Sequence, residues 1–155
     1  MNHIAPKNQS AADDLTGHYL EDLSVGMAAT FAKTVTEADI LAFCGVSGDT
    51  NPVHINADYA ASTPFKSRIA HGMLSAAYIS AVLGTKLPGP GCIYVEQNLR
   101  FKAPVRIGDT VKASATIVEI VAEKRRVTLT TVCTVGDTVV IDGTATVMVP
   151  RRPAA

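Results

Sequence analysis

A carboxylate and an imidazole stand five positions apart in the segment Gly48-Asp49-Thr50-Asn51-Pro52-Val53-His54. An aspartate beside a histidine is an acid/base pair that can move a proton near neutral pH. Pro52 fixes its own φ and keeps Asn51 out of the α region, so the segment cannot continue as one regular helix. A turn at this place can bring Asp49 and His54 to one site. Such a pair alone is more often a capped turn than a catalytic site, because Asp and Asn are common turn formers.

The complete string around the pair closely resembles the signature of the R-specific enoyl-CoA hydratases, the MaoC-like hydratase 2 family. That signature has an aromatic residue, a spacer, an aliphatic and a small residue, then G-D-x-N-P-aliphatic-H, and a small residue six positions after the histidine. Every position is matched here, by Phe43, Val46, Ser47, Gly48-Asp49, Asn51-Pro52-Val53-His54 and Ala60. The resemblance covers residues 19–149 and implies a hot-dog fold. It also implies reversible hydration of a trans-2-enoyl-CoA to an (R)-3-hydroxyacyl-CoA.

The resemblance gives roles to three residues of this chain. Asp49 is the expected base for the attacking water, and His54 is expected to hold the same water and to pass on its proton. The backbone N–H of Gly72 is expected to polarise the thioester carbonyl, because a helix N-terminus offers free N–H groups and the positive end of the helix dipole. Simple helix-start geometry is the other interpretation of Gly72. The sequence does not assign the group that protonates C2.

Three further residues are expected to support this site. Asn51 is predicted to shape the turn and to orient Asp49. Ser80 falls where the family carries a supporting serine, although a serine in an apolar helix can equally bond back to its own backbone. His71 can be interpreted as a second catalytic histidine, but we favour a residue that supports the site or simply packs behind it, because the family motif gives the chemistry to the earlier histidine.

Other functions on the same fold remain open at this point. An acyl-CoA thioesterase would aim its water at the thioester carbon, but thioesterases of this fold generally lack the G-D-x-N-P-x-H string. A dehydratase that acts on a carrier-protein thioester would need a basic docking patch, which the balanced charge does not indicate. An acyl-CoA-binding module would not need Asp49 and His54 together. Chain length and branching of the acyl group, the physiological direction and the pathway are not determined by the sequence.

Composition limits the partners of the chain. Its 155 residues predict one domain. The 14 basic and 14 acidic residues cancel, so no broad field favours nucleic acid or an anionic membrane. Cys44, Cys92 and Cys133 are widely spaced and form no metal-binding or disulfide pattern. We therefore expect no metal and no separate cofactor, since the CoA belongs to the acyl-CoA substrate.

The hydropathy of the chain bears on the cellular location of the protein and on the bounds of its domain. No apolar run occurs before Thr16, and no uninterrupted apolar stretch reaches the roughly 18 residues that a membrane-spanning helix requires. We expect a cytoplasmic protein without a membrane partner. Residues 1–18 are predicted to be a disordered arm, residues 19–150 the hot-dog domain and residues 151–155 a flexible tail.

The hydrophobic pattern predicts an α+β domain in which an antiparallel sheet wraps around a buried central helix. Thr36 and Asp39 predict a capped helix start, and Asn56 predicts a brief helix over residues 57–61. Residues 71–84 form the most helical segment, and because it is apolar nearly all round we expect it to be buried. Period-two alternation predicts strands over residues 27–35, 93–101, 111–121, 127–135 and 139–149, with turns at Gly108-Asp109 and Gly136-Asp137 and a bulge or sheet edge at Pro104. The resemblance also implies a homodimer in which the edge strands of two copies pair.

Overall fold

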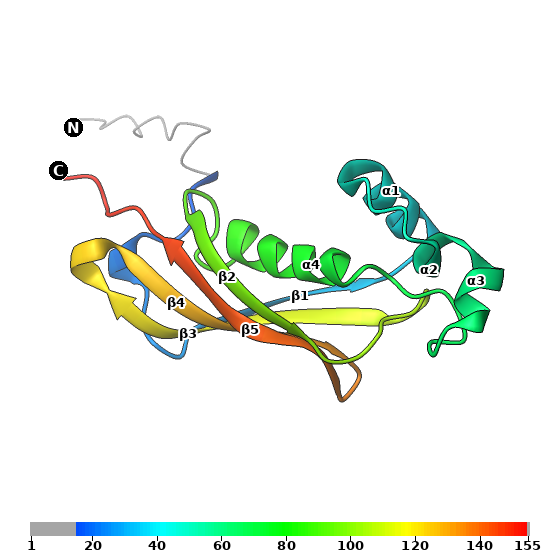
Figure 1. Cartoon of the computed structure of the whole chain (residues 1–155). Helices are drawn as coiled ribbons and strands as arrows, with labels where there is room; N and C mark the ends of the chain where they lie inside the picture. Colours follow the sequence, from blue (N-terminus) through cyan, green and yellow to red (C-terminus); the bar gives the residue numbers. More distant parts are fainter. Residues whose placement is uncertain (1–14, 155) are drawn as a thin grey trace, which may run out of the picture.

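The computed structural model describes residues 15–154, and in this range five strands form one antiparallel sheet with a long helix packed along one face (Figure 1). This arrangement confirms the predicted α+β class. The elements are η2 (Leu20–Asp22), β1 (Ala28–Thr34), α1 (Glu37–Ser47), α2 (Pro52–Ile55), α3 (Ala57–Ser62), α4 (Gly72–Thr85), β2 (Ile93–Phe101), β3 (Thr110–Val121), η3 (Ala122–Lys124), β4 (Arg126–Val135) and β5 (Thr138–Met148).

The strand order in the sheet is β1-β3-β4-β5-β2. The β4–β5 hairpin turns at Gly136-Asp137, as predicted, and the predicted turn at Gly108-Asp109 lies directly before β3. The short helix η3 joins β3 to β4. β2 does not pair with β3, which follows it in the chain, but lies at the opposite edge beside β5. Gly143 allows this pairing, since a Cβ there would stand 1.9 Å from the carbonyl oxygen of Asn98.

Pro104 lies outside the sheet. β2 ends at Phe101, and Pro104 belongs to the connection that leads from β2 to β3. The prediction of a bulge or a sheet edge at Pro104 was therefore wrong, because the chain leaves the sheet before the proline removes a ladder hydrogen bond.

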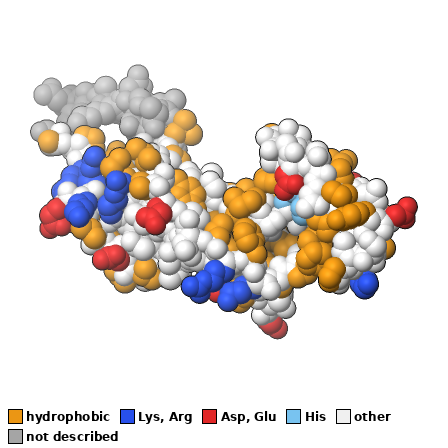
Figure 2. All heavy atoms as spheres, in the orientation of Figure 1, with side chains coloured by type: hydrophobic (Ala, Val, Ile, Leu, Met, Phe, Trp, Pro, Cys, Tyr) orange, Lys and Arg blue, Asp and Glu red, His pale blue; other side chains and the backbone are white. Residues whose placement is uncertain are grey.

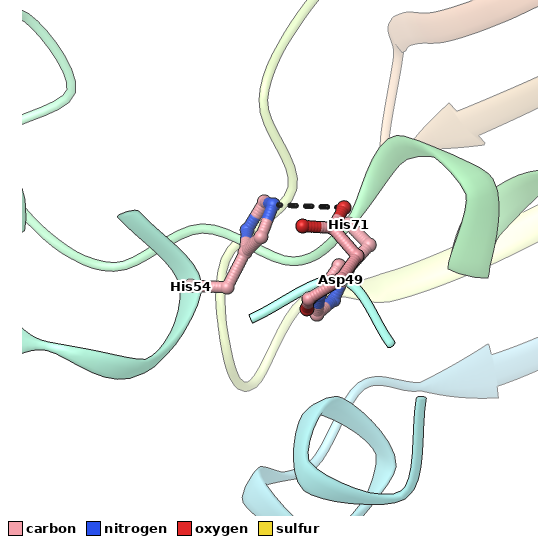
Figure 3. Close-up of side chains that lie close together, drawn as sticks. All are labelled: Asp49, His54 and His71. Atoms are coloured by element: carbon pink, nitrogen blue, oxygen red, sulfur yellow. Dashed lines mark hydrogen bonds and ion pairs between the residues drawn. The ribbon is translucent and has the colours of Figure 1, made fainter. Parts of the chain in front are cut away.

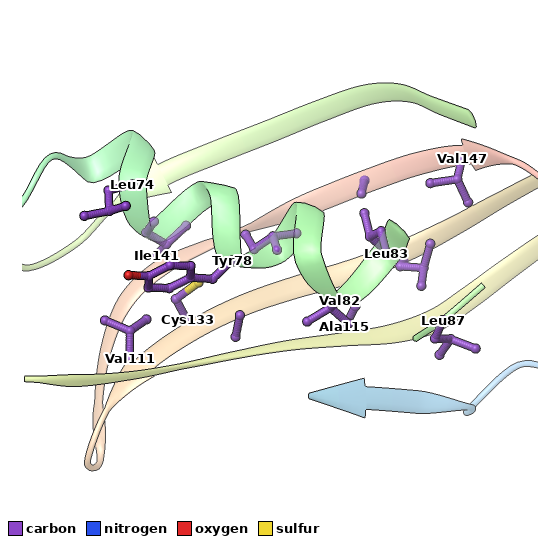
Figure 4. Close-up of a cluster of buried hydrophobic side chains, with 14 of the residues drawn as sticks. Leu74, Tyr78, Val82, Leu83, Leu87, Val111, Ala115, Cys133, Ile141 and Val147 are labelled. Carbon is purple, nitrogen blue, oxygen red and sulfur yellow. The ribbon is translucent and has the colours of Figure 1, made fainter. Parts of the chain in front are cut away.

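The core forms between α4 and the concave face of the sheet (Figures 1 and 4). One stripe of α4 is buried, and inward-facing residues of β3, β4 and β5 meet it. The residues labelled in Figure 4 are Leu74, Tyr78, Val82, Leu83, Leu87, Val111, Ala115, Cys133, Ile141 and Val147.

The central helix α4 is buried along the sheet, as predicted, but its other face is open in a single chain. Met73 is 56% exposed, and Ala77, Ser80 and Gly84 are exposed as well. The sheet covers only the Leu74–Tyr78 side of the helix. Apart from Met73 the open face consists of small residues, so the hydrophobic pattern alone did not show that it lacks cover.

A small helical layer beside the end of the sheet carries the predicted catalytic segment (Figure 1). As predicted, α1 begins with a capping box in which the Asp39 carboxylate accepts the Thr36 N–H at 2.9 Å. The ammonium of Lys33 also donates to this carboxylate. The hydrogen bond from Lys33, with those from Thr36, lowers the pKa of Asp39 to about 2. Asn56 caps α3 by accepting the Tyr59 N–H at 2.8 Å, as predicted.

The two ends of the described chain contact the domain. Most of the predicted arm, residues 1–14, lies outside the described residues, but the N–H groups of Gly17 and His18 donate to the carbonyls of Pro90 and Pro88 at 2.9 and 2.8 Å. The Arg152 guanidinium stands 5.0 Å from the centre of the Tyr19 ring. No helix within residues 15–154 is long and apolar enough to span a membrane.

Candidate active site

The turn after α1 fixes the position of the Asp49 carboxylate. Gly48 ends α1 in the left-handed conformation with φ 75°, which glycine adopts without strain. The Asp49 N–H then donates to Ser47 Oγ at 3.1 Å, and Asp49 Oδ1 accepts the Asn51 N–H at 3.2 Å. Asn51 Oδ1 accepts the Val53 N–H at 3.2 Å and so caps α2. The segment therefore leaves α1, turns and enters a new helix, as the proline predicted.

His54 lies on α2 and points its outer nitrogen at Asp49. Its Nδ1 stands 2.8 Å from the carbonyl oxygen of Ile69, and because a carbonyl only accepts, Nδ1 carries the proton of the neutral ring. His54 Nε2 then presents a lone pair, at 4.0 Å from Asp49 Oδ2. The His54 side chain is nearly buried whereas the Asp49 side chain is half exposed. The separation is too long for a direct hydrogen bond but leaves room for a bridging water.

His71 connects the start of α4 to the same turn (Figure 3). Its Nε2 stands 2.9 Å from the backbone carbonyl oxygen of Asp49, so Nε2 is the donor. His71 is 2% exposed, and its ring lies over the His54 ring with their centres 3.8 Å apart and their planes tilted by 31°. The centre of the Phe43 ring lies 4.9 Å from the centre of the His71 ring. His71 thus holds both the backbone of Asp49 and the ring of His54. His71 Nδ1 has no partner among the described residues.

A cavity of about 410 Å³ opens beside the pair. Asp49 and His54 form one part of its wall, and the remaining wall is largely apolar, with Ile69, Val105 and Ile141 among its residues. Figure 2 shows a hollow bordered by hydrophobic side chains, with histidine visible in it. The cavity therefore joins an acid/base pair to a space suited to a hydrocarbon chain.

Gly72 lies in the same cavity, at the first position of α4. Its N–H has no partner within the helix, because the first four N–H groups of a helix have none. A Cβ at Gly72 would stand 2.6 Å from Phe101 Cε1. The absence of a side chain at Gly72 thus lets the Phe101 ring pack closely against the start of α4.

Ser80 is not brought to this site in a single chain. It lines another cavity, of about 490 Å³, between α4 and β2, together with Met73 and Tyr94. Sequence reasoning missed Ser75, which lines the catalytic cavity, is 1% exposed and has an Oγ without a partner among the described residues. Its position one helical turn after His71 was the available signal.

Asp49, His54 and His71 lie close enough together to be considered as metal ligands, with one ligand atom from each within 4.8 Å of the others. An imidazole binds a metal in the plane of its ring. The rings of His54 and His71 lie one over the other, so a shared ion would stand out of the plane of at least one ring. The arrangement does not favour a metal site, and the expected absence of a metal stays a prediction.

Comparisons with known proteins define the class. Residues 24–141 match the family model described as a MaoC like domain, so the chain belongs to the MaoC-like family, and the predicted hot-dog fold is confirmed. The chain is 63% identical over 142 residues to an (R)-specific enoyl-CoA hydratase of Rhodospirillum rubrum, covering 92% of this chain and 99% of that protein.

Two further relatives are similar over most of their length. A 3-hydroxybutyryl-CoA dehydratase of Methylorubrum extorquens is 49% identical over 88% of this chain and 87% of that protein. The solved structure of the R-hydratase PhaJ1 from Pseudomonas aeruginosa superposes with a TM-score of 0.83 and 45% identity, over 88% of each chain. Hydro-lyases of this family are thus the proteins that this chain resembles.

Proposed function

We propose that the protein catalyses the R-specific, reversible addition of water to a trans-2-enoyl-CoA, giving an (R)-3-hydroxyacyl-CoA. The observation that carries this proposal is the 4.0 Å gap between Asp49 Oδ2 and His54 Nε2 at the wall of an apolar cavity. The similarity to an (R)-specific enoyl-CoA hydratase supports the same reaction.

The gap explains how the water is activated. Both atoms that border it are proton acceptors, so a water between them donates one hydrogen to each and turns an oxygen lone pair to the acyl chain. As that oxygen attacks C3, Asp49 takes a proton and His54 keeps the water in place. The C2–C3 π electrons move to C2 and the thioester oxygen, and C2 then receives a proton. If one water supplies both the hydroxyl and this proton, the addition is syn.

The start of α4 is suited to the negative charge on the thioester oxygen. The unpaired N–H of Gly72 and the positive end of the helix dipole would stabilise the enolate-like oxygen. The amide lies in the same cavity as Asp49 and His54, so a bound thioester can contact all three groups. We propose short to medium acyl chains, such as crotonyl, for the apolar part of the cavity.

We also propose that the protein is a homodimer. β2 lies at the edge of the sheet and pairs only with β5, and Ile93 and Val95 on it are exposed. The open face of α4 lies beside it, and the two border the cavity that contains Ser80. A second copy could cover both apolar surfaces at once. The predicted supporting role of Ser80, like the cytoplasmic location and the absence of a cofactor, stays a prediction.

Incubation of the purified protein with crotonyl-CoA tests the reaction. The enoyl-thioester absorbance should fall, and chiral analysis should find (R)-3-hydroxybutyryl-CoA. Release of free CoA would instead indicate a thioesterase, with the water aimed at the thioester carbon. An S product, or no turnover of crotonyl-CoA and octenoyl-CoA, would contradict the proposal.

A further inference from the structure

A second cavity, of about 420 Å³, is lined by basic side chains. It lies between the start of α3 and two loops, residues 63–69 and residues 102–109. No acidic residue contributes to its lining, which consists of Ala57, Lys66, Ser67, Arg68, Arg106 and Ile107. In a chain whose total charge is zero, this local excess of positive charge requires an explanation.

Two of the three cations are not neutralised. Arg68 forms a bidentate ion pair with Glu37, at 2.9 and 2.5 Å, and this pair lowers the pKa of Glu37. Within residues 15–154, in contrast, the Lys66 ammonium has no hydrogen bond or ion pair. The Arg106 guanidinium donates only to two uncharged acceptors, the hydroxyl of Ser67 and the carbonyl oxygen of Phe65. Three of its five N–H groups therefore remain for a ligand.

The basic cavity and the catalytic cavity share their wall. Phe65 and Ile69 line the catalytic cavity, and the residues between them, 66–68, line the basic one. On the facing loop Val105 lines the catalytic cavity, and Arg106, the next residue, lines the basic one. The adjacent residues place the free cations next to the catalytic cavity, so one long ligand could contact both places.

We propose that Lys66 and Arg106 bind the phosphate groups at the nucleotide end of the CoA thioester. CoA carries its phosphates at the far end of a flexible pantetheine arm, so the reacting thioester and the anionic groups occupy separate places. A guanidinium offers a planar fork of donors to phosphate, and a lysine ammonium adds a compact charge. The identification of CoA rests on the proposed function, whereas the affinity of the cavity for a phosphorylated nucleotide does not.

The variant Lys66→Ala tests this inference, because the side chain is exposed and its ammonium forms no hydrogen bond or ion pair within residues 15–154, so its loss should not disturb the fold. Arg106 is less suitable, since it also holds the Phe65 loop. With crotonyl-CoA, KM should rise about tenfold while kcat stays unchanged, as expected for loss of one charged hydrogen bond. With crotonyl-pantetheine, which lacks the nucleotide, the variant and the wild type should be equal. Lys124→Ala, in η3 at the other end of the domain, is the matched control and should change neither.

Calorimetric titration with adenosine 3′,5′-bisphosphate keeps this test independent of catalysis. The wild-type protein should bind it, and Lys66→Ala should bind it about tenfold more weakly. Binding without any hydratase activity would support the phosphate site and reject the proposed reaction. An equal effect of Lys66→Ala on both crotonyl thioesters, or no bisphosphate binding, would overturn the site and leave the reaction untouched. A loss confined to crotonyl-carrier-protein would also overturn it, since the cavity would then dock a protein.

Discussion

Replacement of Gly72 by alanine separates the catalytic use of this position from its packing. The new Cβ would stand 2.6 Å from Phe101 Cε1 and 2.7 Å from Phe101 Cδ1, about 1 Å closer than an ordinary carbon contact. Phe101 is more than half exposed, so its ring can move outward at a cost of about 1 kcal/mol. The free energy of unfolding should therefore change by no more than about 2 kcal/mol.

The expected effect on catalysis is larger. Alanine keeps the backbone N–H, but its methyl group and the displaced Phe101 ring both border the cavity where the thioester oxygen would approach this donor. Keeping the oxygen away from the donor should cost about as much as losing the donor, a factor of about 100 to 1,000 in rate. We expect kcat/KM for crotonyl-CoA to fall by about this factor. Steady-state kinetics measures it, and urea unfolding checks the fold.

Two control variants make this result specific. Gly45→Ala changes an exposed glycine inside α1, where an added Cβ would meet no atom within 4 Å beyond its chain neighbours and the helix backbone, and it should keep full activity. Phe101→Ala combined with Gly72→Ala removes the ring that the new methyl displaces. If the double variant regains activity, the displaced ring caused the loss. Wild-type kcat/KM in Gly72→Ala would refute the proposed contact between the thioester and the Gly72 amide.

Three further predictions concern the supports of the site. Asp39→Asn should lower stability at neutral pH. The folded pKa of Asp39 lies near 2 and its ordinary value is 3.8, so the difference in the free energy of unfolding between wild type and variant should shrink as the pH falls from 3.8 towards 2. Urea unfolding at several pH values measures this difference, and a difference that grows would contradict the prediction. His71→Ala leaves the Asp49 carbonyl without its donor and opens a cavity, so it should cost about 2–4 kcal/mol in urea unfolding; an unchanged midpoint would contradict its positioning role. Ala77→Arg, on the open face of α4, should convert the proposed dimer to a monomer in light scattering, and an unchanged mass would reject that interface.

Local chemistry made much of the fold and the turn predictable. Pro52 excluded one continuous helix, and the Thr36–Asp39 capping box fixed the start of α1. The β-branched alternation placed the strands within one or two residues of their observed bounds. These features depend on neighbours in the sequence, and the turn that brings Asp49 to His54 is one of them.

The features that sequence reasoning missed depend on long-range contacts. The place of β2 beside β5 requires the close approach of Gly143 to Asn98, which no local pattern shows. The hydrogen bond from His71 to the Asp49 carbonyl joins residues 22 positions apart. An apolar helix such as α4 also does not reveal whether its second face is covered by the same chain or by a partner.

The activity of Asp49→Asn tests the central claim most directly. The asparagine keeps an oxygen that can accept the Asn51 N–H, and the side chain at this position is half exposed. The free energy of unfolding should therefore change by less than about 1 kcal/mol. Loss of the base should lower kcat for crotonyl-CoA about 100-fold or more, whereas Asp58→Asn, an exposed change on α3, should leave it unchanged. A stable Asp49→Asn protein with kcat within threefold of wild type would contradict the assignment of Asp49 as the base.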